Sequence, residues 1–150
     1  MPINLDQIKK LRELTKAGIM DCRRALEESN GDFNKAKAWL TKKGAMVAAK
    51  KADRETKAGI VEAYVHSDGC LGALVKLSCE TDFVARNKEF KKLAHELAMQ
   101  VAAMSPESVG ELLKQEYIRD PKKKIEDLIK EAIGKLKENI KVEDFARIEV

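Results

Sequence analysis

The spacing of apolar residues changes along this chain, and this change restricts the fold more than any other feature of the sequence. In the first 43 residues, apolar side chains recur every three or four positions, as on one face of a helix. Between residues 59 and 79 they recur at every second position, which is typical of strands. Helical spacing returns from residue 87 to residue 136, and alternation returns in Phe145–Val150. The chain is therefore predicted to adopt an α+β fold.

Three short helices are predicted in residues 1–43. Asn30–Gly31 ends the second helix with a pair that tolerates positive φ, and Asp32 can cap the third. Such a three-helix module has about the smallest size that folds unaided. The apolar faces of the three helices contain, in order, Leu5, Ile8, Leu11 and Leu14, then Ile19, Cys22 and Leu26, then Phe33, Ala36 and Leu40.

Residues 44–57 are rich in alanine and lysine, and we predict that they form a helical connector between two parts of the chain. A solvated helix is the ordinary interpretation of such a composition. The basic residues leave a second interpretation open, namely a binding site for nucleic acid within Lys42–Lys57. The residues concerned are mainly Lys50, Lys51, Arg54 and Lys57.

A small antiparallel sheet is predicted in residues 58–150. The first strand, Gly59–His66, places Val61, Ala63 and Val65 on one face and Glu62, Tyr64 and His66 on the other. Ser67–Gly69 has turn chemistry and leads into a second alternating strand, Leu71–Cys79. Phe145–Val150 is predicted to be the third strand. Helices are expected to cover one face of this sheet.

Three helices are predicted between the second and third strands. Asn87 is predicted to cap the first of them, which carries a wide apolar stripe. Ser105–Pro106 and Asp120–Pro121 are each predicted to start a further helix, because proline is tolerated in a first turn. The last helix would bury the apolar residues between Ile125 and Leu136.

Composition narrows the classes of function. Hydrophobic residues make up 44% and charged residues 36%, so a packed core under a heavily charged surface is expected. The aromatic fraction of 5% speaks against a base-stacking surface for single-stranded nucleic acid. The net charge of +4 comes from 29 basic and 25 acidic side chains mixed along the chain, which is a weak argument for nucleic acid.

The sequence predicts neither a membrane span nor a secretion signal. No window approaches the roughly 18 apolar residues that a span needs, and the first residues lack the basic and apolar stretches of a signal peptide. Cys22, Cys70 and Cys79 share no CxxC spacing, and their odd count argues against an internal disulfide framework. A reducing cytoplasm is the expected compartment.

No set of catalytic residues can be assembled from the sequence. His66 and His95 are isolated, and neither belongs to a metal-ligand spacing. Glycine-rich phosphate loops, nucleophile elbows and HExxH motifs are missing from the sequence. We therefore expect a protein that is not an enzyme and has no cofactor or metal.

The segment Glu80–Asn87 has two interpretations. Thr81–Asp82 is ordinary capping chemistry at a helix entrance, and Phe83 could pack back against that helix. Alternatively, Asp82 and Phe83 project together from a rigid turn between strand and helix. A large apolar side chain beside a carboxylate is the composition of a binding anchor.

Two ungapped motifs point to a known family. Thr81–Asn87 reads TDFVARN, and Leu11–Leu26 reads LRELTKAGIMDCRRAL and is continued by Asn30–Asp32. They resemble the TDFVA(K/R)(N/D) signature and the LRxxTxAGxMDCKKAL segment of the elongation factor Ts family, in the expected order. The resemblance runs over essentially the whole chain, through Phe145–Arg147.

The resemblance implies a fold as well as partners. It implies a ubiquitin-associated-like bundle in residues 1–43 and a core of three antiparallel strands and helices in residues 58–150. The chain has room for only one core subdomain, whereas some members of the family have two. Short members compensate by pairing two copies, so a homodimer through the sheet region is implied. Neither a membrane nor nucleic acid is implied as a partner.

The activity implied by the resemblance is exchange of GDP for GTP on elongation factor Tu, in its GDP-bound and nucleotide-free forms. Thr81, Asp82, Phe83 and Val84 are the implied contacts near the nucleotide. Asp82 and Phe83 would enter the GTPase domain, with Phe83 wedged between helices, and would disturb the ligands of Mg²⁺. This ion tolerates little departure from octahedral geometry.

A second set of contacts is implied on the N-terminal module. Arg12, Ile19 and Met20 would hold the same GTPase domain from another side. Ile19 also fits the core of the module itself, so both interpretations of its side chain stay open.

Two other classes of function stay open beside the exchange factor. One is a nucleic-acid-binding protein that uses the basic connector, and the other is an adaptor that uses only the helical bundle to hold a partner helix. Cys79 likewise has two interpretations, as a buried reduced thiol or as half of an intermolecular disulfide in a dimer.

Overall fold

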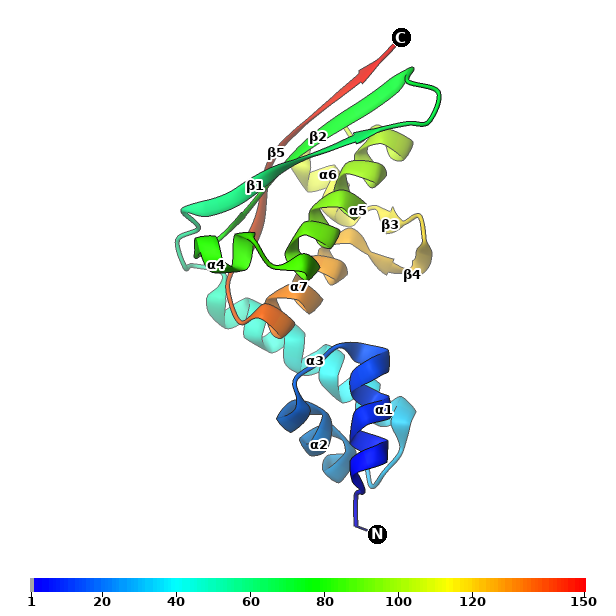
Figure 1. The fold of residues 1–150 in the computed structure, drawn as a ribbon, viewed down its shortest axis with the longest axis vertical. Coiled ribbons are helices and arrows are strands. Elements are labelled where there is room, and N and C mark those ends of the chain that lie inside the picture. The colour runs from blue at the N-terminus through cyan, green and yellow to red at the C-terminus, as the bar shows by residue number, and fades with distance from the viewer. Residues whose placement is uncertain (1) are drawn as a thin grey trace.

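The computed structural model describes residues 2–150 and shows an elongated molecule with its two ends far apart (Figure 1). Three helices form a small bundle at the N-terminal end, and a larger part built from both helices and strands occupies the other end. We call the first part the bundle and the second the core domain. The helices of the bundle are α1 (Leu5–Thr15), α2 (Ile19–Glu28) and α3 (Phe33–Lys51).

The bundle buries a narrower face of its first helix than predicted. Ile8 and Leu11 are buried, whereas Leu5 and Leu14 are exposed. Successive residues of a helix are about 100° apart, so Leu5 and Leu14 lie on opposite sides and cannot share one face. The predicted turn and cap between α2 and α3 are confirmed. The side chain of Asp32 accepts hydrogen bonds from backbone N–H groups of α3, and Asn30–Gly31 takes positive φ.

Helix α3 joins the bundle to the core domain. It runs unbroken from Phe33 to Lys51, so the predicted boundary between residues 43 and 44 lies inside it. Alanine has the highest helix propensity, and the alanine-rich second half of α3 therefore continues the helix. Ala48 in this half is buried in the hydrophobic core of the second part. None of the helices within residues 2–150 has both the length and the apolar character needed to cross a bilayer.

The core domain consists of an antiparallel sheet with helices against one of its faces, which confirms the predicted α+β fold. The strand order is β1-β2-β5, and a second sheet has two strands, β3 and β4. The elements are β1 (Ala58–Val65), β2 (Leu71–Cys79), α4 (Asp82–Ala85), α5 (Lys88–Met104), α6 (Val109–Lys114), β3 (Glu116–Tyr117), β4 (Asp120–Lys124), α7 (Ile125–Leu136) and β5 (Ile140–Glu149).

The two faces of the sheet differ in what covers them. Val75 and Leu77 of β2 point toward the helices and are fully buried together with Phe90 of α5. On β1, the residues that face the helices are Ile60, Glu62 and Tyr64. The alternate residues of β1, Val61, Ala63 and Val65, are exposed on the outer face. The outer face is thus apolar along β1 and is not covered in the single chain, whereas Lys76 of β2, opposite Val61, brings charge to the same face.

Two predicted helix starts are wrong. Ser105 ends α5 in the left-handed conformation, and α6 starts at Val109, where Ser108 supplies the capping hydroxyl. Asp120–Pro121 begins strand β4, and α7 starts only at Ile125. Proline has no N–H to donate, but it is tolerated in an edge strand, and each strand of a two-stranded sheet is an edge.

The third strand of the main sheet is longer than the predicted Phe145–Val150. Strand β5 begins at Ile140, which pairs with Cys79, and the register then continues along β2 to Leu71. The pairing of β2 with β5 shifts by one residue next to Leu77 and interrupts the alternation of β5. The first half of β5 could therefore not be recognised from alternating apolar residues.

Two glycines let α3 and α7 approach until their backbones touch. Gly44 lies in α3 and Gly134 in α7. A Cβ atom added to Gly134 would lie 2.8 Å from the Cα of Gly44. Carbon atoms in good contact are about 3.5–4.0 Å apart, so no larger residue fits at position 134 without separating the helices. This crossing fixes the bundle to the core domain.

We predict that Gly134→Ala lowers the free energy of unfolding by about 1–3 kcal/mol, because overpacking at a close contact strains both helices. Urea unfolding followed by circular dichroism measures the change. Gly110→Ala in α6 is the matched control, since the nearest atom to an added Cβ there is 3.8 Å away. Equal stability of the two variants would contradict the close crossing.

Candidate functional site

The candidate site begins at a sharp corner where β2 ends and α4 starts. The side chain of Thr81 accepts a hydrogen bond from the backbone N–H of Val84 at 3.3 Å and so caps α4. The predicted capping role of Thr81 is confirmed. A single helical turn, Asp82–Ala85, follows and leads through Asn87, the cap of α5, into the long helix.

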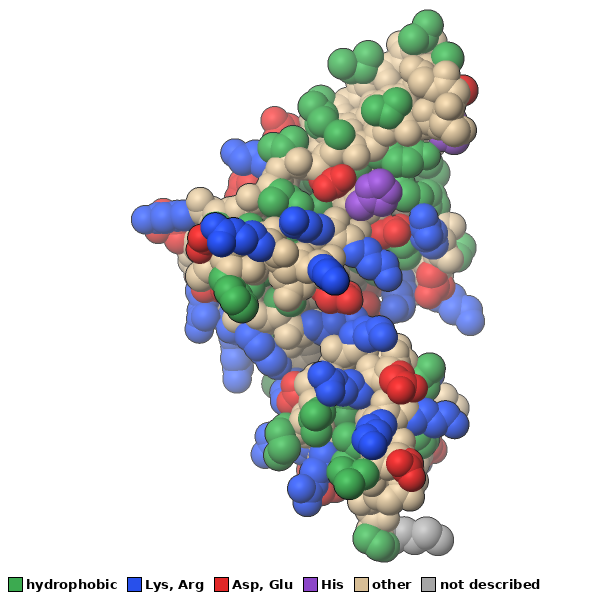
Figure 2. Space-filling model, in the orientation of Figure 1, with side chains coloured by type: hydrophobic (Ala, Val, Ile, Leu, Met, Phe, Trp, Pro, Cys, Tyr) green, Lys and Arg blue, Asp and Glu red, His purple; other side chains and the backbone are tan. Residues whose placement is uncertain are grey.

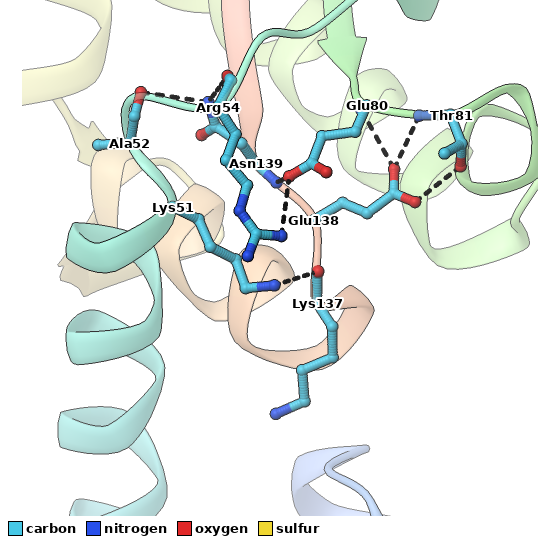
Figure 3. A network of polar contacts seen from close by, with 8 residues as sticks. All are labelled: Lys51, Ala52, Arg54, Glu80, Thr81, Lys137, Glu138 and Asn139. Carbon is cyan, nitrogen blue, oxygen red and sulfur yellow. Dashed lines mark hydrogen bonds and ion pairs between the residues drawn. The ribbon is translucent and has the colours of Figure 1, made fainter.

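A carboxylate from a distant part of the chain fixes this corner. Glu138 accepts hydrogen bonds from the backbone N–H groups of Glu80 and Thr81 at 3.1 and 2.9 Å. It also accepts one from the hydroxyl of Thr81 at 2.7 Å (Figure 3). Bonds to a charged acceptor are about twice as strong as neutral ones. The start of the candidate motif is therefore held by two backbone hydrogen bonds and one side-chain hydrogen bond.

The side chain of Glu80 extends this network in the opposite direction. Its carboxylate accepts a hydrogen bond from the backbone N–H of Asn139 at 2.8 Å and lies 3.8 Å from the guanidinium of Arg54. The buried amide of Asn139 donates to the carbonyl groups of Ala52 and Arg54 at 3.3 and 2.7 Å (Figure 3). The corner, the end of α3 and the start of β5 thus form one hydrogen-bonded unit.

The aromatic ring at the corner points away from the protein. Phe83 is 81% exposed, the highest value among the large apolar residues within 2–149. The carboxylate of Asp82 beside it is also exposed and pairs with Arg86 at 3.2 Å. The interpretation in which Phe83 packs back on its own helix is therefore wrong. Asp82 and Phe83 project together from a fixed turn.

Val84 has a different position from the other three residues of the predicted set. Its side chain is buried in the core of the chain itself, as is that of Ala85. A one-turn helix with one side in the core must turn its other side to solvent. Val84 therefore anchors the turn, while Asp82 and Phe83 form its accessible surface.

The second predicted set of contacts lies in the bundle, apart from the corner (Figure 1). Ile19 is 51% exposed and Met20 is 70% exposed at the start of α2, and Arg12 is exposed on α1. Of the two interpretations of Ile19, the structure supports the surface position, because the buried residues of α2 are Cys22, Ala25 and Leu26. The structure does not bring the two sets together into one site.

Sequence reasoning missed Glu138 and Asn139, which hold the corner from more than fifty positions away in the sequence. No local pattern marks them, since Glu138 stands in a charged stretch between a helix and a strand. Their role follows only from the pairing of β2 with β5, which brings the two strand ends together.

Three of the four main basic residues of the connector contact other groups of the protein, and Lys50 is exposed. Lys51 donates to the carbonyl of Lys137, and Arg54 lies against Glu80. Lys57 forms an exposed ion pair with Glu55 at 3.5 Å. These contacts leave less free positive charge for a nucleic-acid backbone than the sequence alone predicts.

Cys79 lies directly beneath the corner and is fully buried. Its thiol donates a hydrogen bond to the carbonyl of Thr81 at 3.1 Å. Burial, helped by the negative charge of Glu138, raises the pKa of the Cys79 thiol to about 11. The thiolate is the reactive form of cysteine, so this environment favours the buried reduced thiol over the intermolecular disulfide.

Comparison with known proteins places this arrangement in a family. A family model described as Elongation factor TS matches residues 80–150. The chain is 46% identical to elongation factor Ts of Thermotoga maritima over 193 aligned positions, covering 100% of this chain and 97% of that protein. It is 40% identical to elongation factor Ts of Oleidesulfovibrio alaskensis, with 99% and 98% covered. The chain belongs to the elongation factor Ts family.

Membership of the elongation factor Ts family confirms the resemblance seen in the sequence and places the chain among the elongation factors of translation. The matched region begins at Glu80, the first residue of the corner. The alignment with the Thermotoga maritima protein extends over more positions than the 150 residues of this chain. That relative therefore contains residues without a counterpart here.

We predict that iodoacetamide labels Cys70 in the folded protein much faster than Cys22 or Cys79, because Cys70 is exposed and the other two are buried. At pH 7 only about one Cys79 thiol in ten thousand is ionised at a pKa of about 11. Mass spectrometry of the labelled peptides measures the rates, and the urea-unfolded chain is the control. Labelling of folded Cys79 at the rate of Cys70 would contradict the described environment.

Proposed function

We propose that this chain promotes the exchange of GDP for GTP on elongation factor Tu. The observation that carries the proposal is the exposed ring of Phe83 on a hydrogen-bonded corner, in a member of the elongation factor Ts family. An isolated aromatic ring in water gains free energy when it enters an apolar site, about 1.5–3 kcal/mol for a full burial. Since the backbone is already fixed, little ordering free energy opposes that gain.

The proposed mechanism acts on the Mg²⁺ site of the GTPase. Phe83 wedges between helices beside that site, and the carboxylate of Asp82 enters with it. Mg²⁺ requires near-octahedral ligands, so small displacements of those ligands weaken its hold on the phosphates of GDP. Thr81 and Val84 hold the turn that carries the two inserting side chains.

Nucleotide exchange of this kind involves no bond making or breaking by the factor. The factor and the nucleotide weaken each other's binding to the GTPase by the same ratio, as thermodynamic linkage requires. The factor therefore accelerates release without changing the final equilibrium. It needs no acid, base, nucleophile, cofactor or metal of its own. In the proposed role the protein is therefore not an enzyme.

The bundle supplies a second contact in this proposal. Ile19 and Met20 form an exposed apolar pair on α2, and the guanidinium of Arg12 is available on α1. Together they would hold the GTPase from another side while Phe83 acts at the nucleotide. Removal of residues 1–43 should weaken this complex but leave some exchange through the corner, whereas a simple adaptor would lose all function.

We predict that Phe83→Ala slows the release of fluorescent GDP from purified elongation factor Tu by about thirtyfold at subsaturating factor, the effect of losing a binding anchor of about 2 kcal/mol. Stopped-flow fluorescence measures the release rate. Circular dichroism should be unchanged, because the ring makes little contact with its own chain.

The matched control is Met104→Ala, which removes a half-exposed apolar side chain at the far end of α5. It should leave the release rate close to that of the unchanged protein. If Phe83→Ala released GDP as fast as Met104→Ala, the proposed wedge would be refuted.

We also propose that two copies of the chain associate through the outer face of the main sheet. Val61 and Val65 of β1, Leu74 of β2 and Ile148 of β5 are all exposed there. The strand register places Leu74 directly between Ala63 and Ala146, so the apolar residues are contiguous across the three strands. Figure 2 shows hydrophobic side chains at the upper end of the molecule, where Figure 1 places the strands of the main sheet. A contiguous apolar surface of this kind marks an interaction site.

We predict that Leu74→Lys converts the dimer into a monomer, because association would bury two like charges in an apolar interface. Sedimentation velocity across a range of protein concentrations measures the mass. Ile118→Lys, at an exposed position outside the main sheet, is the control and should remain dimeric. An unchanged protein that stays monomeric at high concentration would exclude this interface.

A further inference from the structure

A cavity lies at the junction between the bundle and the core domain. Its volume is about 360 Å³. Its wall combines residues of all three bundle helices and of the α1–α2 connection with residues of β4 and α7 and the residue that follows α7. Small-molecule sites in proteins have volumes of about 300–1,000 Å³. The cavity is separate from the corner that carries Phe83, since none of residues 80–87 lines it.

The wall of this cavity is strongly basic. It contains two carboxylates, Asp21 and Glu131, and a larger number of ammonium groups. The lysines that line it are Lys37, Lys43, Lys123, Lys135 and Lys137. Figure 2 shows lysine and arginine side chains gathered around the waist where the bundle meets the core domain. The lysines therefore exceed the carboxylates, and the cavity attracts anions.

A carboxylate of the chain itself, that of Asp21, already lies between two of these lysines. The two carboxylate oxygens of Asp21 accept separate hydrogen bonds, one from Lys43 and one from Lys137 at 3.2 Å. Burial alone would raise the pKa of Asp21, but the two lysines more than offset it and hold the pKa below its usual value. The geometry of Lys43 and Lys137 is thus suited to oxygen atoms of a charged group.

Two further lysines on the wall have no internal counterion. Lys37 and Lys135 are exposed and form no ion pair with any of residues 2–150, whereas Lys123 is paired with Glu131 at 2.9 Å. One carboxylate cannot neutralise Lys43, Lys137, Lys37 and Lys135 together. Apolar side chains form another part of the wall. They are Leu14, Ala17, Leu40 and Val47.

From this arrangement we infer that the junction cavity binds a small anion that carries several phosphate groups. Several phosphates are required because the free charge is spread over lysines from α3 and α7, on two sides of the cavity. Such a ligand replaces Asp21 between Lys43 and Lys137 and also contacts Lys37 and Lys135. It thereby bridges the bundle and the core domain.

Isothermal titration of the full chain with inorganic tripolyphosphate at low and moderate salt tests this site. Lys37→Gln combined with Lys135→Gln should weaken binding roughly tenfold, about threefold for each ion pair lost at a partly exposed position. Lys88→Gln combined with Lys91→Gln, on exposed positions of α5, removes the same charge outside the cavity and should leave binding almost unchanged. Equal weakening in both double variants would overturn the proposal, because it would show binding to net charge alone.

A second pair of variants tests the role of Asp21 as an internal competitor. Asp21→Asn removes the carboxylate from between Lys43 and Lys137 and should tighten tripolyphosphate binding about threefold or more. Asp53→Asn removes the same charge from an exposed position outside the cavity and should have little effect. Weaker binding by Asp21→Asn, or no binding by the unchanged chain at millimolar tripolyphosphate, would refute the site.

A short single-stranded RNA, titrated separately into the same variants, tests the alternative of a nucleic-acid surface. The small-anion site predicts that RNA binds no more tightly than tripolyphosphate and is insensitive to the two lysine substitutions. Much tighter RNA binding that the same substitutions abolish would show a nucleic-acid surface instead and would contradict the proposal. Phe83→Ala should not change tripolyphosphate binding, so this test is independent of the exchange activity.

Discussion

The contact between the backbones of α3 and α7 at Gly44 and Gly134 determines how the two parts of this protein are joined. Because no side chain separates the helices there, α3 can extend from the bundle and bury Ala48 in the core domain. The end of α3 then reaches the strand ends of the main sheet, where its last residues take part in the polar network. The junction cavity, which is lined by Gly44 and Gly134, lies at the same crossing.

The corner separates the residues that fix its shape from the residues that it displays. Backbone N–H groups of Glu80 and Thr81 are held by Glu138, and Val84 is held by apolar contacts in the core. These interactions satisfy the polar atoms without using Asp82 or Phe83. The side chains of Asp82 and Phe83 therefore remain available to another protein, and the turn that carries them keeps one conformation. A binding anchor works best under these conditions, since little disorder is lost when it is inserted.

The sequence was sufficient for the parts of this fold that depend on local patterns. Alternation identified β1 and β2, and the capping residues Asp32, Thr81 and Asn87 were correctly assigned because a cap acts within three residues. Local patterns misplaced the apolar face of α1 and the start of α6. The remaining errors arose where distant pairing decides the structure. Pro121 lies in an edge strand, and the first half of β5 follows β2 across a register shift. The support of the corner by Glu138 and Asn139 could not be predicted for the same reason.

The unbroken course of α3 sets a fixed distance between the two candidate contact surfaces. A helix of 19 residues spans roughly 28 Å at 1.5 Å per residue, and the glycine crossing clamps it to α7. The bundle, which carries Met20, and the core domain, which carries Phe83, are therefore held at a fixed separation. Under the proposed function, a partner whose two complementary sites lie at another spacing engages only one of these surfaces, so α3 would add a requirement on dimensions to the requirement on chemistry.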